Sequence, residues 1–300
     1  MVSRLTPFYS DVQTHYDLSD DFFALFLDPS RTYSCAYWDR PGITLEQAQL
    51  AKIDLALGKC DLRPGMTLLD IGCGWGSTML RALQRHQVNV IGLTLSRNQF
   101  HHVQARLAAR TGGPRAEVRL QGWEEFDEPV DRIVSIGAFE HFRQERYEQF
   151  FDFAYRTLPA DGIMLLHTIV IYGLNHLRQN GIRLTKDDFA FMRFMLTEIF
   201  PGGQLPLPTG QAPRGVREYA EQAGFEVSRI HPLQMHYAKT LDHWAEALRE
   251  NRSRAVELSS LETYGTYMRY LTGCAELFRG GIIDVMQFTC GKPGTGHLSD

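Results

Sequence analysis

One short segment, Leu69 to Gly76, has the residue types that bind a nucleotide. From Asp70 it has the order Asp-x-Gly-x-Gly-x-Gly, after an apolar run that predicts a β-strand. Glycines let a backbone approach a ligand closely, and the free amides at the start of the next helix offer hydrogen-bond donors. A nicotinamide enzyme would need Gly-x-Gly-x-x-Gly and an acid about twenty residues later. Here the acid comes first and the second strand ends in Gly92-Leu93-Thr94-Leu95, without a carboxylate, which disfavours a nicotinamide cofactor.

Two further side chains, Glu140 and His167, could stabilise a cation or move a proton. Glu140 lies just past the predicted fourth strand, and His167 lies within the fifth. An isolated His in an apolar strand is usually a core residue, and a Glu at a strand end is usually a cap or an ion-pair partner. In a parallel sheet, however, both would lie near the carboxyl edge, where ligands bind. Because Glu140 and His167 are predicted to lie close together at this edge, they are candidate catalytic residues.

The elements that must position these residues alternate between strands and helices. Strands are predicted at 67–71, 88–93, 117–121, 132–136 and 163–171, and helices at 44–57, 76–85, 96–110 and 141–157. Such alternation is typical of an α/β fold with a doubly wound, mostly parallel sheet. We therefore expect a Rossmann-like domain.

Two regions depart from the alternation. We expect one domain over residues 1–300, with residues 1–43 as an N-terminal helical cap and residues 173–211 as an inserted helical lid. The lid contains a helix start at 184–188, and the residues from Phe189 to Phe200 are apolar on nearly every face, so this helix is expected to avoid solvent. It is either an ordinary buried helix or one that also lines an acyl-chain tunnel.

The amino-acid composition limits the classes of protein to which this chain can belong. Hydrophobic residues make up 44% of the chain and charged residues 22%, as in a soluble globular enzyme, and no apolar run reaches membrane-spanning length. Residues 1–26 lack the uninterrupted apolar centre of an export signal, so a cytoplasmic location is expected. The net charge of -4 offers no global attraction to nucleic acid. The five cysteines have no Cys-x-x-Cys spacing, which argues against a disulfide framework and a metal site.

The loop after the first strand resembles the first motif of the class I methyltransferases that use S-adenosylmethionine. The chain also resembles, almost end to end, the mycolic acid methyltransferases and cyclopropane synthases. Glu198-Ile199-Phe200-Pro201-Gly202-Gly203 and Tyr33-Ser34-Cys35-Ala36-Tyr37 carry this resemblance. So do the segments 69–76, 89–96, 121–126, 132–142 and 270–274, whereas 172–183 and 205–215 are irregular against the family pattern.

The resemblance implies a reaction. In that family the double bond of a long-chain acyl lipid attacks the sulfonium methyl group, and the resulting carbocation closes to a cyclopropane or gives a methyl-branched product. The site must therefore stabilise a cation and exclude water. The acyl chain is expected on an acyl carrier protein, an acidic partner for which this net acidic chain needs a local basic patch.

The resemblance also implies site residues. A bicarbonate ion is expected as the general base, held around Cys35, Glu140, His167 and Tyr237, with Cys35 acting through its backbone amide. Cys274 is a weaker catalytic candidate, because no activating group is evident beside it. The residues expected to contact the cofactor are Tyr33, Ser34, Asp70, Gly72, Gly74, Trp75, Gly76, Thr94, Gln99, Trp123, Glu124 and Ile136. Thr94 and Gln99 would replace the acid that most methyltransferases carry after the second strand.

Two other functions stay open on the sequence alone. A small-molecule N- or O-methyltransferase would share the fold and the loop but needs a polar acceptor pocket, which the Phe- and Met-rich lid disfavours. A non-catalytic lipid-binding protein would leave the presence of Glu140, His167 and Tyr237 together without an explanation.

Overall fold

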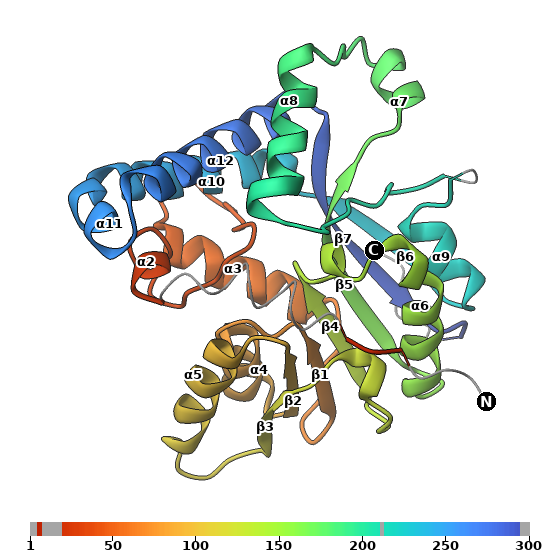
Figure 1. Ribbon diagram of the computed structural model, residues 1–300. Helices are drawn as coiled ribbons and strands as arrows, with labels where there is room; N and C mark the ends of the chain where they lie inside the picture. Colours follow the sequence, from red (N-terminus) through yellow and green to blue (C-terminus); the bar gives the residue numbers. More distant parts are fainter. Residues whose placement is uncertain (1–4, 8–19, 211–212, 295–300) are drawn as a thin grey trace.

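The described residues form one mixed sheet with the strand order β3-β2-β1-β4-β5-β7-β6 (Figure 1). The computed structural model describes residues 5–7, 20–210 and 213–294. The strands are β1 (Thr67–Ile71), β2 (Asn89–Thr94), β3 (Ala116–Leu120), β4 (Arg132–Ile136), β5 (Ile163–Ile171), β6 (Glu226–Pro232) and β7 (Ile283–Gly291). The first five are parallel, and β7 runs antiparallel to both of its neighbours. This confirms the predicted Rossmann-like α/β fold with a mostly parallel sheet.

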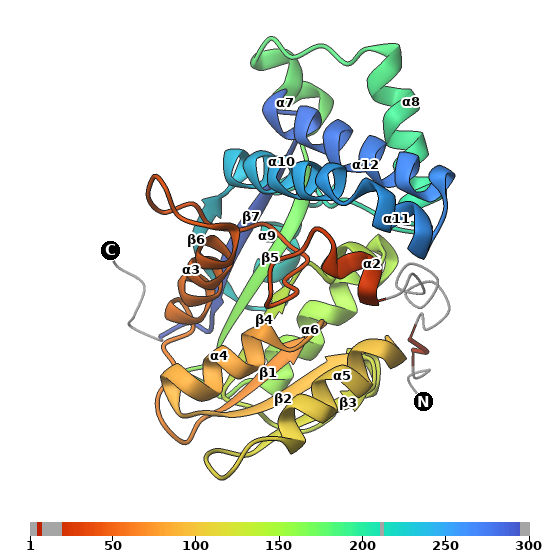
Figure 2. The ribbon, with the colours of Figure 1, turned by 90° about the vertical axis from the view of Figure 1, so that its left-hand side faces the viewer.

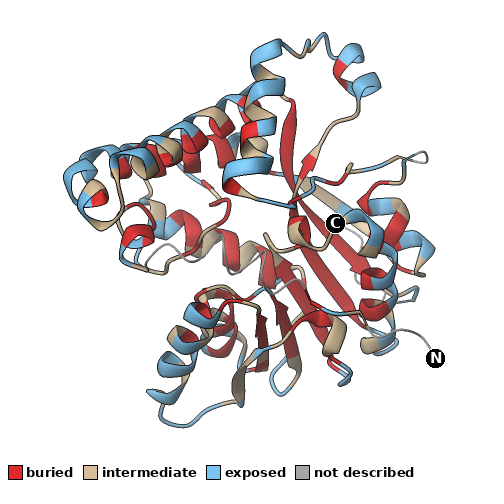
Figure 3. Ribbon diagram, in the orientation of Figure 1, coloured by how far each residue is buried: buried red, intermediate tan, exposed pale blue. Residues whose placement is uncertain are grey.

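Helices cover both faces of the sheet (Figures 1 and 2). On one face lie α3 (Leu45–Gly58), α4 (Ser77–His86) and α5 (Arg97–Ala108), and on the other lie α6 (Tyr147–Thr157) and α9 (Val216–Gln222). Successive strand residues point to opposite faces, so Leu68 packs under the first set and Leu69 under the second. The central strands β1, β4, β5 and β7 are accordingly buried along most of their length (Figure 3), whereas the edge strands β3 and β6 are more exposed. The predicted N-cap Thr44 accepts a hydrogen bond from the Gln47 amide.

A third group of helices lies beyond the carboxyl ends of the parallel strands. It comprises α2 (Asp20–Ala24), α10 (Gln234–Glu250), α11 (Arg252–Leu258) and α12 (Leu261–Arg279). Their apolar residues form a core of their own around Trp244, continuous with Ile283 and Val285 of β7. Among the described residues, none of the helices has the length and apolarity that crossing a membrane requires.

The lid contains α7 (Leu174–Gln179), α8 (Lys186–Phe194) and a π-helical turn (Met195–Ile199). The prediction that this helix avoids solvent is wrong, because Phe189 is 57% and Leu196 50% exposed. The lid packs through one side only. Phe191 lies on α12 at Gly273, where an added Cβ would overlap its ring. The other side faces outward because no element covers it in the described chain (Figure 1).

Two other predicted helical regions differ from the structure. Residues 139–146 form two 3-10 turns, Phe139–His141 and Gln144–Arg146, and α6 begins only at Tyr147. Arg143, with φ of 62°, interrupts the helix predicted from residue 141. In the N-terminal region 1–43, α2 is the helix that the described residues contain; residues 1–4 and 8–19 lie outside them.

We predict that Phe151→Ala lowers the free energy of unfolding by about 3 to 5 kcal/mol, because it leaves a cavity between α6 and the sheet. Phe189→Ala is the matched control and should change stability by less than about 0.5 kcal/mol, since that ring is exposed. Urea unfolding of both variants measures this. Equal losses would contradict the burial pattern.

Candidate active site

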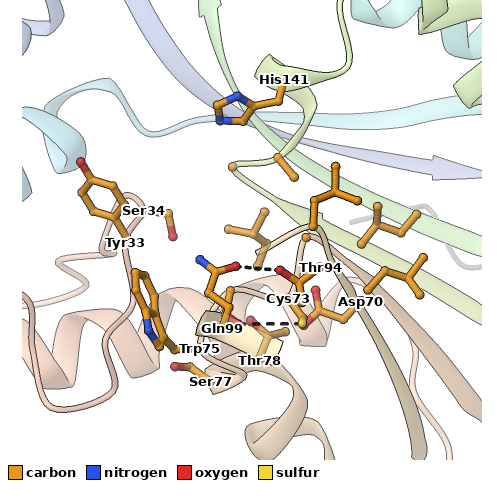
Figure 4. Close-up of a pocket in the computed structure, with 18 of the residues that line it drawn as sticks. Tyr33, Ser34, Asp70, Cys73, Trp75, Ser77, Thr78, Thr94, Gln99 and His141 are labelled. Atoms are coloured by element: carbon orange, nitrogen blue, oxygen red, sulfur yellow. Dashed lines mark hydrogen bonds between the residues drawn. The ribbon is translucent and has the colours of Figure 1, made fainter. Parts of the chain in front are cut away.

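A first cavity opens at the carboxyl ends of β1, β2 and β4 (Figure 4). Eleven of the twelve residues predicted to contact a cofactor line it: Tyr33, Ser34, Asp70, Gly72, Gly74, Trp75, Thr94, Gln99, Trp123, Glu124 and Ile136. Gly76 is the exception. The structure thus brings together residues from five separate segments at the predicted sheet edge.

The glycine loop follows β1 directly, and its glycines have different tasks. Gly72 has φ of 79° and lies so close to Ala138 that an added Cβ would overlap it. Gly74 has φ of 56° and faces open space within the cavity wall, so its peptide is exposed to a ligand. Gly76 has φ of 84°, precedes α4 and packs against Val103. Gly76 is not among the residues that line the cavity, and it starts the helix α4.

Asp70 is buried at the end of β1, and its Oδ2 atom has no hydrogen-bond partner within the described chain. Burial raises the pKa of this carboxyl to about 7, and the positive charge of Lys52 opposes the rise. Lys52 is also buried, and its Nζ donates to Ser34 Oγ over 2.8 Å. Burial lowers the pKa of the Lys52 ammonium to about 8. Sequence analysis did not identify Lys52; its position on the buried face of α3 was the available indication.

Two polar side chains stand where many methyltransferases carry an acid. Thr94 Oγ1 donates to Gln99 Oε1 over 2.8 Å (Figure 4), and the Ser96 amide donates to Thr94 Oγ1 over 3.1 Å. The pair is buried and presents amide and hydroxyl groups to the cavity rather than a charge. This arrangement suits neutral hydrogen bonding to a ligand.

Trp123 and Glu124 line the opposite part of the cavity. Glu124 forms an ion pair with Arg146 over 3.0 Å, and burial raises the pKa of its carboxyl. The Trp123 indole packs edge-on against Phe150, and its Nε1 has no partner among the residues described. Trp123 is therefore both a core residue and part of the cavity wall.

A second cavity, of about 440 Å³, adjoins the first. Its lining is mainly apolar and comes from the lid, α10, α12, β5 and β7. All five predicted catalytic residues line it: Cys35, Glu140, His167, Tyr237 and Cys274. The two cavities share Tyr33, Ser34, Gly137 and His141 as common walls. A group in the first cavity can therefore face one in the second across this boundary.

Glu140 and His167 place polar atoms in this apolar cavity. Glu140 Oε1 accepts a hydrogen bond from the Ile169 amide over 2.7 Å, whereas its Oε2 has no partner in the described structure. Burial raises the pKa of this carboxyl. His167 Nδ1 lies 3.3 Å from Gln287 Nε2, and its Nε2 likewise has no described partner. Burial lowers the pKa of the imidazole well below its usual value.

The two cysteines are in environments that keep them protonated. Cys35 Sγ donates to the Ala36 carbonyl over 3.2 Å, and burial raises the pKa of its thiol. Cys274 Sγ lies 3.8 Å from Met195 Sδ, and burial raises its pKa as well. Neither environment activates a thiolate. Groups of three or more His, Cys, Asp or Glu that could hold a metal ion do not occur in the described ranges.

His141 is a further site residue that sequence analysis did not select. It lies in the 3-10 turn beside Glu140 and lines both cavities, facing Tyr33 and Ser34 across the opening in Figure 4. Its adjacency to Glu140 was the only indication in the sequence.

Comparison with known proteins decides the family. The family model for mycolic acid cyclopropane synthetase matches residues 3–288. The chain belongs to this family. It is 57% identical to cyclopropane mycolic acid synthase 1 of Mycobacterium tuberculosis over 97% of this chain and 100% of that protein.

Solved structures agree with the family assignment. The cyclopropane synthase MmaA2 from Mycobacterium tuberculosis superimposes with a TM-score of 0.93 at 56% identity, covering 96% of this chain and 99% of that one. Mycolic acid cyclopropane synthase CmaA1, solved in complex with SAH and CTAB, gives a TM-score of 0.91 at 58% identity over the same shares.

We predict that Asp70→Asn changes how stability depends on pH. The folded carboxyl keeps its proton up to about pH 7, whereas an unfolded Asp loses it near pH 4. The folded state therefore binds the extra proton, and the free energy of unfolding falls as the pH rises through this window. Relative to the variant, the wild type should lose up to about 2 kcal/mol between about pH 5 and pH 7.

Denaturant unfolding at several pH values measures this difference. Asp152→Asn, on the exposed side of α6, is the matched control and should follow the wild-type curve. Parallel curves for the wild type and Asp70→Asn would show that Asp70 is not protonated at neutral pH.

Proposed function

We propose that this protein transfers the methyl group of S-adenosylmethionine to a double bond of a long-chain, mycolic-type acyl lipid. The observation that carries the proposal is the contact between the two cavities at Tyr33, Ser34, Gly137 and His141. One cavity has the polar lining that a nucleoside needs, and the other has the apolar lining that an alkyl chain needs. A methyl group crossing the boundary would pass directly from donor to acceptor.

The first cavity fits S-adenosylmethionine. The exposed peptide at Gly74 and the unpartnered Asp70 Oδ2 and Trp123 Nε1 are positions that a bound nucleoside could satisfy. Thr94 and Gln99 would accept and donate hydrogen bonds, and Trp123 would offer a flat apolar face. When bound, the sulfonium supplies an electrophilic methyl group. The relative CmaA1, solved with SAH, supports this assignment.

The second cavity suits a lipid chain rather than a polar acceptor. Met192, Met195 and Leu196 of the lid face Leu277 and Phe278 of α12 across it. The flexible, polarisable methionines adapt to an alkyl chain of variable position. Residues 173–211 then serve as a lid over the chain. CTAB, found in the CmaA1 structure, is a detergent with a long alkyl tail.

We infer that the acyl chain arrives on an acyl carrier protein.

Attack of an alkene on a methyl donor leaves a positive charge on carbon, and the cavity offers groups to stabilise it. Glu140 provides a carboxylate oxygen with no other partner, and Tyr33 and Tyr270, whose hydroxyls are 3.2 Å apart, provide π-faces. The apolar walls exclude water that would trap the cation. Loss of a proton from the added methyl group then gives a cyclopropane, and other fates of the cation give methyl-branched products.

A bicarbonate ion would supply the base for that proton. Cys35, through its backbone amide, and Glu140, His167 and Tyr237 would hold it. The unpartnered Glu140 Oε2 and His167 Nε2 atoms, both at the second cavity, fit such an ion. The protonated thiol of Cys35 is consistent with a role for its backbone rather than its sulfur.

We predict that Glu140→Gln lowers lipid methylation by at least about a hundredfold, because a neutral amide stabilises a cation poorly, while binding of the methyl donor persists. Purified protein is incubated with S-adenosylmethionine and a mono-unsaturated long-chain acyl lipid, and mass spectrometry measures the gain of one methylene. Donor binding is measured by calorimetry.

Glu145→Gln is the matched control. It removes the same charge, and Glu145 is exposed in the neighbouring turn. It should retain wild-type activity. Full turnover in Glu140→Gln would remove Glu140 from the mechanism, and absence of any lipid product with the wild type would refute the proposed function.

A further inference from the structure

A row of polar side chains crosses the sheet behind His167. In the strand register, His167 of β5 lies opposite Gln287 of β7, and Gln287 lies opposite His231 of β6. Residues paired in this way point to the same face of the sheet. Lys59, the C-cap residue of α3, covers the row. Its Nζ lies 2.6 Å from Gln287 Oε1 and 3.0 Å from His231 Nδ1.

Lys59 determines which way the Gln287 amide points. An ammonium group can only donate hydrogen bonds, so the Gln287 atom nearest to it must be the oxygen. The opposite orientation would place the amide NH2 against the ammonium in a part-buried site, with no acceptor between them. Gln287 Nε2 therefore faces His167 Nδ1, at 3.3 Å.

The amide in turn determines the tautomer of His167. Because the Gln287 NH2 group can only donate hydrogen bonds, His167 Nδ1 must be the acceptor in this contact. A neutral imidazole has one N–H, which then lies on Nε2. Burial and the positive charges of Lys52 and Lys59 lower the pKa of His167, so the doubly protonated ring is disfavoured as well. The Nε2 atom has no partner among the described residues.

We propose that Lys59 and Gln287 are positioning residues that hold His167 as the neutral Nε2–H tautomer, which donates a hydrogen bond into the second cavity and cannot act there as a base. The catalytic consequence rests on the proposed function: an N–H at this position binds an oxyanion, and the proton of the cation intermediate must go to another group. The tautomer itself follows from the hydrogen bonds alone.

The tautomer of His167 can be measured directly by NMR spectroscopy. The full chain is labelled with 15N-histidine, and long-range proton–nitrogen correlation spectra distinguish protonated from unprotonated ring nitrogens. Disappearance of one set of peaks in His167→Gln assigns the residue among the 11 histidines. The expected result is a protonated Nε2 and an unprotonated Nδ1. A protonated Nδ1 in the wild type would overturn the proposal without any further variant.

Gln287→Glu provides the matched perturbation. A carboxylate accepts from both Lys59 and His167, so the proton should move to Nδ1 and leave a lone pair on Nε2. Gln84→Glu adds the same charge on the exposed side of α4 and should leave the His167 spectrum unchanged. An unchanged tautomer in a folded Gln287→Glu protein would also contradict the proposal.

Activity is measured separately. Gln287→Glu should lower lipid methylation about ten- to hundredfold, the effect expected when one hydrogen bond to a charged group is lost. If the wild type shows the Nε2–H tautomer but methylates no lipid, the proposed function fails and the positioning role stands. If the wild type methylates lipid with Nδ1 protonated, the positioning role fails and the proposed function stands.

Discussion

Burial of polar atoms without partners is the constraint on which this site depends. Glu140 Oε2 and His167 Nε2 lie in an apolar cavity, and Asp70 Oδ2 lies at the neighbouring one, with no hydrogen bond from the described chain. Each such atom costs about 1 to 3 kcal/mol. The sheet and its three groups of helices must offset this cost, and the buried apolar residues of the central strands (Figure 3) contribute to that compensation. These unpartnered atoms belong to residues that line the two cavities.

The topology explains why the site has two halves. The parallel strands β1, β2 and β4 end at the glycine loop and its neighbours, which line the first cavity. Strand β5 is longer than β4: His167 pairs with Ile136 at the end of β4, and Ile169 lies beyond that end. Both residues line the second cavity. The turn from Gly137 to His141 borders both cavities. In this 3-10 turn, Glu140 accepts a hydrogen bond from the Ile169 amide of β5.

Local patterns indicated which residues would gather at the first cavity. The strand, acid and glycine order around Asp70 is contiguous in sequence, and the alternation of strands and helices sets the parallel sheet by itself. What could not be predicted depends on long-range pairing or on tertiary packing. Strand β7 is antiparallel and joins β5 across more than a hundred residues, so no local pattern indicated that Gln287 would lie beside His167. Helix α8 of the lid packs on α12 at Gly273 and exposes its other side at Phe189. The apolar composition of the segment does not indicate which side is covered. Lys52 and Lys59 were missed because a lysine on a helix is usually solvated.

The central claim is that donor and lipid lie in adjoining cavities that meet at Tyr33, Ser34, Gly137 and His141. A crystal structure of this protein with S-adenosylhomocysteine and a long-chain alkyl detergent tests it most directly. The claim predicts the nucleoside against the glycine loop, the sulfur at the boundary and the alkyl chain between the lid and α12. A nucleoside bound elsewhere, or an alkyl chain outside the second cavity, would contradict it.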